Sequence, residues 1–333
     1  MNRLSSLFVF LKRISSRSHS VSHSVNQSPS RTHSVSRSFL SSISVPYSLS
    51  VSMLCLVGII SSCNIINPDE EIPAYVEVRG INVGSNYLTQ GTTSANITDV
   101  WVYAEGVLLG VYELPARIPI LLSGKHKISF GAGIKANGIS STSEFYNLYK
   151  FHEVELDLIP GQVTVVDTFT VNYFSALQYT WYEDFEKDTS GGGISLDTTG
   201  ISLADIFPDS VDVFEGNRSL KMQVTTAQNF IECRSVGDGY PLPVGKDVYL
   251  EMDYKCTQPF VMGLIGVTTN GDKLIPIIRL NEKAEWNKIY IRLGPYVNFN
   301  VTAFKFKVYF RLALQAPLTE GTVYLDNLKL ISN

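Results

Sequence analysis

The chain has 333 residues, of which 44% are hydrophobic and 17% charged, with 27 Lys and Arg against 31 Asp and Glu. Residues 1–62 hold 6 of the basic residues and none of the acidic ones, so the remainder carries 21 minus 31, a net charge of −10. This sign argues against a nucleic-acid partner and against membrane attachment through a basic patch, because both call for a basic surface.

The apolar run before Cys63 is the first element with a clear meaning. Residues 51–62 are too short to span a bilayer, which needs about 20 apolar residues, but they suit a signal peptide with small residues before its cleavage site. Ile60-Ser61-Ser62-Cys63 resembles the bacterial lipobox. The resemblance implies that Cys63 is the lipid-attachment site, acylated by chains such as palmitate, which hold stably when several act together. The alternative is a cysteine at the end of a core strand.

The segments on either side of the cysteine indicate export. Residues 16–39 are low-complexity and show no apolar periodicity, so residues 1–62 are interpreted as a signal peptide with a Ser-, His- and Arg-rich extension. Residues 63–74 are interpreted as a tether. By resemblance to sorting rules in double-membrane bacteria, Asn64 implies the outer membrane. The acidic residues 69–71 resemble the surface-export tether of Bacteroidota lipoproteins, so we expect the protein to face the cell surface.

The next hundred residues, 75–177, are predicted to form a β-sandwich. Glu105-Gly106 joins two alternating segments in a hairpin signal, and further turns are expected at Ser123-Gly124 and Pro160-Gly161. Six or seven short strands in a stretch of this length are typical of an immunoglobulin-like or transthyretin-like sandwich.

An aromatic loop interrupts this first sandwich. Residues 137–149 are irregular and bring Phe145, Tyr146 and Tyr149 close together. Such a loop is a candidate site for a partner or a glycan. It can equally fold back over an edge of the core.

Residues 178–333 are predicted to form a second sandwich, a jelly roll. Residues 248–255 alternate between apolar and polar side chains, which is typical of a half-buried strand. Asn270-Gly271 is a strong hairpin signal, and Pro276 indicates an edge strand or a bulge. The protein is therefore expected to be all-β, with two sandwiches in tandem.

The second sandwich resembles carbohydrate-binding-module jelly rolls. The segments that carry the resemblance are "WYEDFE", "GNRSLKM", "EWNKIYIRL" and "VYLDNLKL". The resemblance implies a structural calcium ion, whose matching positions are Glu183, Asp184, Glu186 and Asp326. A strand end with solvated carboxylates is the alternative, and the pattern favours it. The inward phase shifts after Leu325 to Leu328, which predicts a bulge at Asp326-Asn327.

Motifs of catalysis are missing from the sequence. There is no G-x-S-x-G elbow, no H-E-x-x-H helix and no P-loop, and only His126 and His152 follow residue 62. Glu251 and Asp253 are candidates for a pair of catalytic carboxylates, but they fall on the outward phase of a strand and are expected to be solvated. We therefore predict that the protein is not an enzyme and has no cofactor beyond the possible calcium ion.

The two cysteines after Cys63 lie on the inward phase of their strands. Cys233 and Cys256 are expected to form a disulfide, which an oxidising compartment permits. Two buried thiols would explain the same phase, because a free cysteine packs as a small hydrophobe.

Three aromatic side chains of the second sandwich are candidates for stacking on a sugar. They are Trp181, Trp286 and Tyr240, since an aromatic face offers an apolar platform with a wet rim. A core position is the alternative for each of them, and it is favoured for each taken alone.

As a whole, the chain resembles Bacteroidota outer-membrane lipoproteins without assigned chemistry, through "NPDEEIPAYVEV" and "NITDVWVYAEGVLLGVYELPARIPIL". The primary hypothesis is an accessory binding or assembly subunit that docks to an outer-membrane barrel protein or to other lipoproteins. The alternative is a surface lipoprotein that binds glycans for a nutrient uptake system.

Overall fold

The computed structural model of the protein describes residues 70–187 and 194–333. Glu70–Asn333 forms one compact unit. No helix within the described residues is long and apolar enough to cross a membrane. The predicted signal peptide and Cys63 lie outside the described residues and stay predictions.

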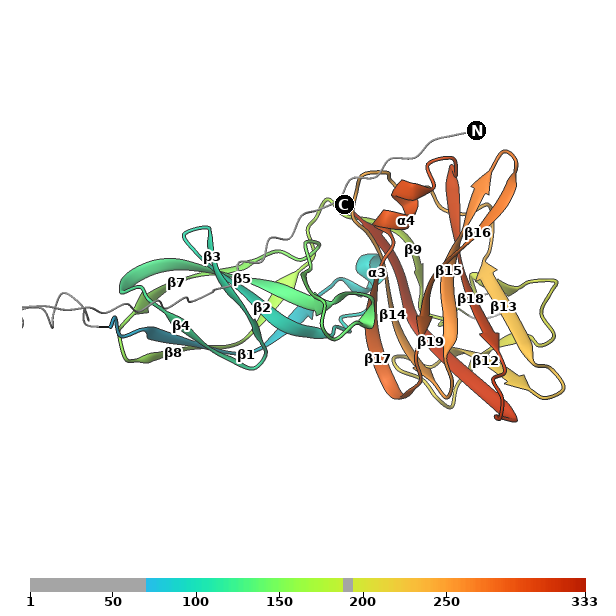
Figure 1. The fold of residues 1–333 in the computed structure, drawn as a ribbon, viewed down its shortest axis with the longest axis horizontal. Coiled ribbons are helices and arrows are strands. Elements are labelled where there is room, and N and C mark those ends of the chain that lie inside the picture. The colour runs from blue at the N-terminus through green and yellow to red at the C-terminus, as the bar shows by residue number, and fades with distance from the viewer. Residues whose placement is uncertain (1–69, 188–193) are drawn as a thin grey trace, which may run out of the picture. The chain divides into compact units, whose positions relative to one another are not determined.

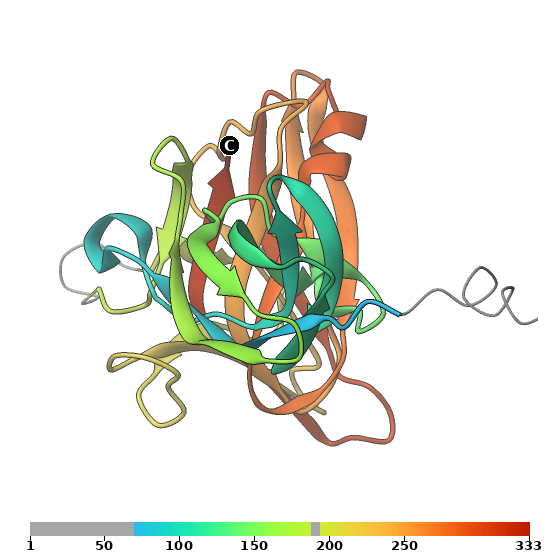
Figure 2. The same ribbon diagram turned by 90° about the vertical axis from the view of Figure 1, so that its left-hand side faces the viewer.

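The first lobe, residues 74–177, contains two packed sheets (Figure 1). One sheet has the strand order β4-β1-β8, and the other has the order β3-β2-β5-β6 with β7 paired to β5. Figure 2 shows this lobe, coloured blue to green, facing the viewer. Its elements are β1 (Ala74–Gly84), α3 (Tyr87–Gln90), β2 (Ile97–Ala104), β3 (Val107–Glu113), β4 (Ala116–Ile120), β5 (Gly124–Lys135), η1 (Ala136–Gly138), β6 (Ser143–Phe145), β7 (His152–Leu158) and β8 (Val163–Asn172).

The second lobe, residues 178–333, is a sandwich of two larger sheets. The strand orders are β10-β13-β18-β15-β16 and β11-β12-β19-β14-β17, with β9 paired to β19. Its elements are β9 (Gln178–Glu183), β10 (Leu196–Thr198), β11 (Ile206–Asp209), β12 (Ser219–Thr225), β13 (Phe230–Ser235), β14 (Val248–Cys256), β15 (Phe260–Thr268), β16 (Gly271–Leu280), β17 (Lys283–Arg292), α4 (Gly294–Phe299), β18 (Lys305–Ala313) and β19 (Glu320–Ser332). The all-β prediction is confirmed.

Local turn chemistry forms the predicted hairpins. Glu105 and Gly106 both adopt positive φ angles, 48° and 81°, which a tight turn between β2 and β3 requires. The hairpin between β15 and β16 also forms, but Thr268 lies opposite Gly271, so its two-residue turn is Thr269-Asn270, one residue before the predicted Asn270-Gly271. Both predicted hairpins therefore form.

Two predicted irregularities also occur where the sequence places them. The register between β15 and β16 shifts beside Gly263, which lies opposite Pro276. Asn327 has a φ of 50°, and the register between β14 and β19 shifts between Glu251 and Asp253. The bulge carries the inward phase from Leu325 to Leu328, as expected.

The predicted disulfide is not formed. Cys233 and Cys256 are both buried free thiols, on strands β13 and β14 of opposite sheets. The Cys256 thiol donates to the Asn281 carbonyl over 3.4 Å. Burial raises the pKa of Cys233 to about 12 and that of Cys256 to about 11, so both thiols stay protonated at neutral pH.

We expect neither thiol to react with a thiol reagent in the native fragment 70–333, which contains no other cysteine. Both should react once the fragment is unfolded in guanidinium without reductant, because burial alone protects them. An absorbance assay of released thiolate measures this. If the unfolded, unreduced fragment has no reactive thiol, Cys233 and Cys256 are joined after all.

The core of the first lobe extends to three buried residues of the second lobe. Tyr249, Tyr290 and Ile331 belong to strands of the second lobe but cluster with the buried residues of the first lobe. The second lobe has its own core between its two sheets, built from inward residues such as Leu250 and Met252. Strand β14 is consequently buried on both of its faces over part of its length.

Candidate functional site

One face of the sheet β11-β12-β19-β14-β17 packs into the core of the second lobe, and we call the opposite face its outer face. Residues of the first lobe cover one half of this outer face, and the other half is open. Strand β14 turns Leu250 and Met252 toward the core of the second lobe, as its alternation predicts. Glu251 and Asp253 point the other way, yet both are 0% exposed because residues of the first lobe pack over them. The prediction that these two carboxylates are solvated is wrong. The sequence pattern shows two faces, but it does not show what covers each face.

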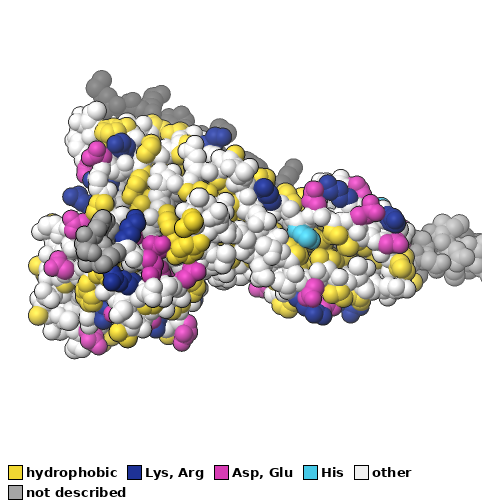
Figure 3. Space-filling view, turned by 180° about the vertical axis from the view of Figure 1, so that it is seen from behind, with side chains coloured by type: hydrophobic (Ala, Val, Ile, Leu, Met, Phe, Trp, Pro, Cys, Tyr) yellow, Lys and Arg dark blue, Asp and Glu magenta, His cyan; other side chains and the backbone are white. Residues whose placement is uncertain are grey.

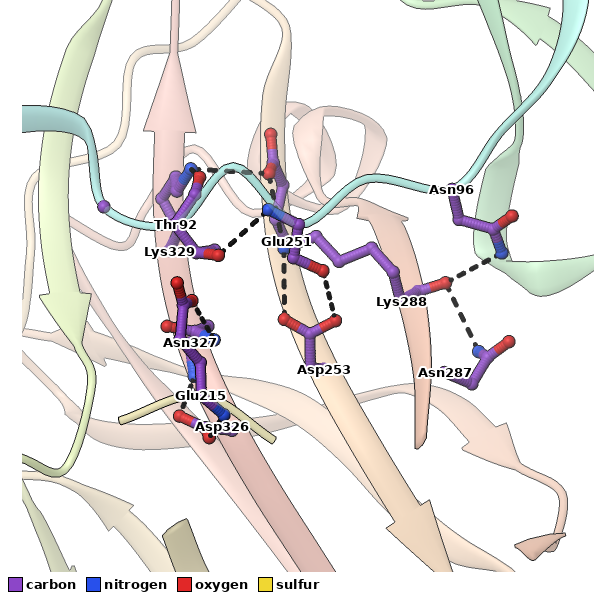
Figure 4. A network of polar contacts seen from close by, with 12 residues as sticks. Thr92, Asn96, Glu215, Glu251, Asp253, Asn287, Lys288, Asp326, Asn327 and Lys329 are labelled. Atoms are coloured by element: carbon purple, nitrogen blue, oxygen red, sulfur yellow. Dashed lines mark hydrogen bonds and ion pairs between the residues drawn. The ribbon is translucent and has the colours of Figure 1, made fainter. Parts of the chain in front are cut away.

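Glu251 lies at the centre of the covered half. Its carboxylate accepts hydrogen bonds from the hydroxyls of Tyr146, over 2.6 Å, and Tyr173, over 2.9 Å. The ammonium groups of Lys288 and Lys329 each lie 3.7 Å from it (Figure 4). Lys329 also donates to the Tyr173 hydroxyl over 3.1 Å.

Asp253 completes a balanced set of four charges. It accepts a hydrogen bond from the Ser94 hydroxyl over 2.8 Å and lies 3.7 Å from the Lys288 ammonium. Burial would raise the pKa of Glu251, but the two lysines and two tyrosine hydroxyls bring it below its ordinary value. Burial raises the pKa of Asp253, and Lys288 opposes this only in part. Burial lowers the pKa of Lys329 to about 8. We call Glu251, Asp253, Lys288 and Lys329 the buried charge quartet.

The aromatic loop of the first lobe packs inward, onto this quartet. Tyr146 and Tyr149 are 0% and 1% exposed, and their rings are 4.7 Å apart. Tyr146 also contacts the rings of Tyr249 and Tyr290, each 5.0 Å away. These two loop tyrosines therefore do not contact a partner or a glycan from the surface, and the alternative that the loop folds over the core applies to them. Phe145 is half-buried and stacks on Phe151 at 5.1 Å.

The four carboxylates expected at a calcium site are occupied by hydrogen-bond donors. Glu183 accepts from the backbone N–H groups of Phe185 and Ser195, and Glu186 accepts from those of Asn217 and Arg218. No group of three His, Cys, Asp or Glu side chains within the described residues is arranged to hold a metal ion.

The other two carboxylates of that set are engaged in the same way. Asp184 accepts from the Tyr182 hydroxyl, and Asp326 accepts from the backbone N–H groups of Glu215 and Asn327. Burial raises the pKa of Asp326 to about 7. The calcium site that the resemblance implies therefore has no support in these four carboxylates, and the favoured alternative of solvated carboxylates is wrong for the buried Glu183 and Asp326.

Trp181 and Tyr240 form a stacked pair at the core of the second lobe. Their ring centroids are 5.7 Å apart with planes inclined by 21°, and Trp181 is only 5% exposed. The Trp181 indole donates to the Ser195 hydroxyl over 2.8 Å. Trp181 is not available to a sugar, and one face of the half-buried Tyr240 ring is covered by it.

Trp286 lies in a different setting, on the open half of the outer face. It is half-buried, and its indole N–H donates to Asp212 over 3.1 Å. Its ring centroid lies 5.7 Å from that of Phe214 and 6.3 Å from that of Tyr324. Asp212 also forms an ion pair with Lys255 over 2.7 Å. The carboxylate that orients the Trp286 indole is therefore itself fixed in position.

A row of side chains across four strands extends this arrangement. Phe207 lies opposite Lys221, Lys221 opposite Tyr324, and Tyr324 opposite Lys255 in the strand register. The Lys221 ammonium is 5.6 Å from the ring centroids of both Phe207 and Tyr324. Phe207 and Phe214 are 41% and 39% exposed. We call Phe207, Phe214, Trp286 and Tyr324 the aromatic platform.

A hollow of about 500 Å³ adjoins the platform, and Tyr324, Lys255 and Lys283 are among its lining residues. Of the four platform residues, only Trp286 was predicted from the sequence as a candidate for stacking on a sugar. Tyr324 could have been found, because it stands between the inward residues Val323 and Leu325. Phe207 lies within the four-residue strand β11 and Phe214 in an irregular segment, where no periodic signal assigns a face.

Comparison with known proteins gives no family. No family model matches the sequence, and no curated protein matches it. The solved structures that resemble it include a carbohydrate-binding module of the β-sandwich superfamily, with 15% identity, 70% of this chain and 84% of that chain covered and a TM-score of 0.35.

Two further solved structures are similar over a smaller share of the chain. The xylan-binding domain of carbohydrate-binding module family 22 has 14% identity, covers 47% of this chain and 96% of its own, and has a TM-score of 0.32. A family 30 carbohydrate-binding module of a Clostridium thermocellum cellulosomal cellulase has 16% identity, covers 45% and 96%, and has a TM-score of 0.33.

Proposed function

We propose that the protein binds a glycan through the aromatic platform on the outer face of its second lobe. The observation that carries the proposal is the aligned row of Phe207, Lys221, Tyr324 and Lys255 beside a tryptophan fixed by Asp212. Aromatic faces bind the apolar faces of sugar rings, and polar groups at the rim bind their hydroxyls. The platform offers both kinds of group on one rigid sheet.

The platform is built for binding rather than for hydrolysis. Glycoside hydrolysis needs two carboxyl groups that flank the bond to be cut. Asp212, the carboxylate that contacts the platform, is already paired with Lys255 and bonded to Trp286. Glu251 and Asp253, the pair considered from the sequence, are closed off beneath the first lobe. This supports a non-catalytic binding role.

The glycan need not be strongly charged. The face shown in Figure 3 mixes basic, acidic and hydrophobic side chains on both lobes. Near the platform, Lys255 is neutralised by Asp212, and Lys221 lies against two rings. Such a surface favours a neutral polysaccharide, recognised by stacking and by hydrogen bonds.

A glycan array probed with the fragment 70–333 tests the proposal. We expect retention of at least one class of neutral polysaccharide, and weaker retention of short oligosaccharides, because several rings of the platform contribute. A fragment that is folded by circular dichroism but binds no glycan on the array would contradict the proposal.

A second candidate function rests on the exposed apolar edge of the first lobe. Strand β3 is an edge strand whose Val107, Leu108, Leu109 and Val111 are 66%, 45%, 37% and 39% exposed. Trp101, which lies opposite Val111, packs on Phe145 at 6.0 Å. An exposed apolar edge is typical of a site for another protein chain. On this basis we propose an accessory subunit that docks through this edge to a barrel protein or other lipoproteins. Its lipid anchor at Cys63, its outer-membrane location and its cell-surface orientation are predictions from the sequence.

Co-purification of the full-length protein from detergent-solubilised membranes tests this second candidate. A stoichiometric partner should appear in mass spectra of the wild type and be lost from Leu109→Lys, which places a charge on the exposed edge. If no companion co-purifies with the wild type, or if Leu109→Lys retains it fully, the edge is not the docking site.

A further inference from the structure

Lys288 and Asp253 form an unusual pair within the buried charge quartet. They lie directly opposite each other on the adjacent strands β17 and β14. The Lys288 ammonium is 3.7 Å from Asp253 Oδ2, and both side chains are buried (Figure 4). Among the described residues, neither Lys288 Nζ nor Asp253 Oδ2 has a hydrogen-bond partner.

Another lysine–aspartate pair of the protein shows the ordinary arrangement. Lys135 donates to Asp99 over 3.0 Å, and its side chain keeps 22% of its surface exposed to water. A buried polar group without a partner costs about 1–3 kcal/mol, and more when it is charged. The Lys288–Asp253 pair thus lacks both the hydrogen bond and the solvent that stabilise the Lys135–Asp99 pair.

A neutral amine and a neutral carboxylic acid avoid the cost of two buried charges. Within the described residues, no hydrogen-bond partner stabilises a charge on the buried Lys288 Nζ. Burial raises the pKa of Asp253 and so favours its protonated form. These are the two protonation states in which an amine can attack a carboxyl carbon.

We propose that Lys288 and Asp253 join in an intramolecular isopeptide bond, with Glu251 as the proton carrier. The Lys288 amine nitrogen attacks the Asp253 carboxyl carbon and forms the new C–N bond. Glu251 takes a proton from that nitrogen and returns it to the departing hydroxyl. The C–O bond breaks and one water leaves, so atoms and charges balance without an oxidant or a cofactor.

The position of Glu251 suits this role. Its carboxylate lies 3.7 Å from Lys288 Nζ, and the hydroxyls of Tyr146 and Tyr173 hold it in place. The first lobe supplies both tyrosines, so the reaction site is complete only when the two lobes are packed together. The bond would then cross-link β14 to β17 beneath the first lobe.

Tryptic digestion of the full-length protein, purified from its host, tests the proposal by mass spectrometry. Lys288 in an amide resists trypsin, so we expect residues 247–255 linked to residues 284–292, lighter than the two peptides together by one water. Residues 128–135, which end at Lys135, should remain unlinked to residues 80–117, which contain Asp99, and they serve as the internal control. Recovery of free 247–255 together with free 284–288 would overturn the proposal.

Two variants separate the bond from its proton carrier. Lys288→Arg keeps the charge but removes the amine, and it should yield only unlinked 247–255. Glu251→Gln keeps the size and an acceptor for the tyrosines, and it should leave most of the protein unlinked. A fully linked Glu251→Gln protein would overturn the role of Glu251, whereas the wild-type digest alone decides the bond, even if a variant fails to fold.

Discussion

Replacing Glu251 with alanine is expected to lower the free energy of unfolding of residues 70–333 by about 3–5 kcal/mol. The side chain is fully buried, and its carboxylate lies 3.7 Å from the ammonium groups of both Lys288 and Lys329. Its removal leaves the buried Lys329 ammonium without its carboxylate partner, and it deprives the hydroxyls of Tyr146 and Tyr173 of their acceptor. Urea unfolding followed by tryptophan fluorescence measures the change.

Glu155→Ala is the matched control for this prediction. Glu155 is also a strand glutamate paired with a lysine, Lys125, but the pair is 3.9 Å apart and its side chain is 70% exposed. Exposed pairs contribute about 0–1 kcal/mol, so this variant should unfold close to the wild type. Equal losses in the two variants would mean that the buried quartet does not stabilise the packing of the lobes.

Replacing Trp286 with alanine is expected to lower the affinity for the bound glycan by at least about 10-fold, about 1.4 kcal/mol. The indole lies between Phe214 and Tyr324 and is oriented by Asp212, so its loss removes the central ring of the platform. The second-lobe core should stay intact, because Trp286 does not belong to it. Isothermal titration with the glycan identified on the array gives the affinity.

Phe151→Ala provides the control for this second prediction. Phe151 is a 38% exposed aromatic residue on the first lobe, outside the platform. Its replacement should leave glycan affinity unchanged. An unchanged affinity in Trp286→Ala, or an equal loss in Phe151→Ala, would place the glycan elsewhere than on the platform.

Local signals in the sequence predicted most of the fold. Glu105-Gly106 forms a tight turn in which both residues adopt positive φ angles, and Gly271, with a φ of 108°, directly follows the turn between β15 and β16. The phase shift at Asp326-Asn327 reports a bulge, since alternation is read along one strand. The positions of the strands, and the side chains that point toward the core, could therefore be predicted from the sequence alone.

The sequence did not predict which residues pack over each face of a strand. Glu251 and Asp253 alternate as solvated residues do, yet Ser94, Tyr146 and Tyr173 of the first lobe lie over them. Their burial depends on contacts between segments about a hundred residues apart, and a period of two carries no information about such contacts. The lysines Lys288 and Lys329 on neighbouring strands were the available hint, because they match the two carboxylates in number and charge.

Cys233 and Cys256 also show that strand alternation does not specify tertiary contacts. Their inward phase was correctly predicted, and it is compatible with either a bond or two thiols. Cys233 and Cys256 belong to opposite sheets, and the Cys256 thiol turns to the Asn281 carbonyl instead. The alternation pattern assigns a residue to the core. A disulfide also requires a specific distance between the two cysteines, which only the packed structure sets.

The central claim, that the platform binds a glycan, is tested most directly by native gel electrophoresis of residues 70–333 through polysaccharide-containing gels, with Trp286→Ala in the neighbouring lane. We predict that at least one neutral polysaccharide retards the wild type and that the variant migrates as it does without polysaccharide. A wild type that no polysaccharide retards, or a variant retarded as strongly as the wild type, would contradict the claim.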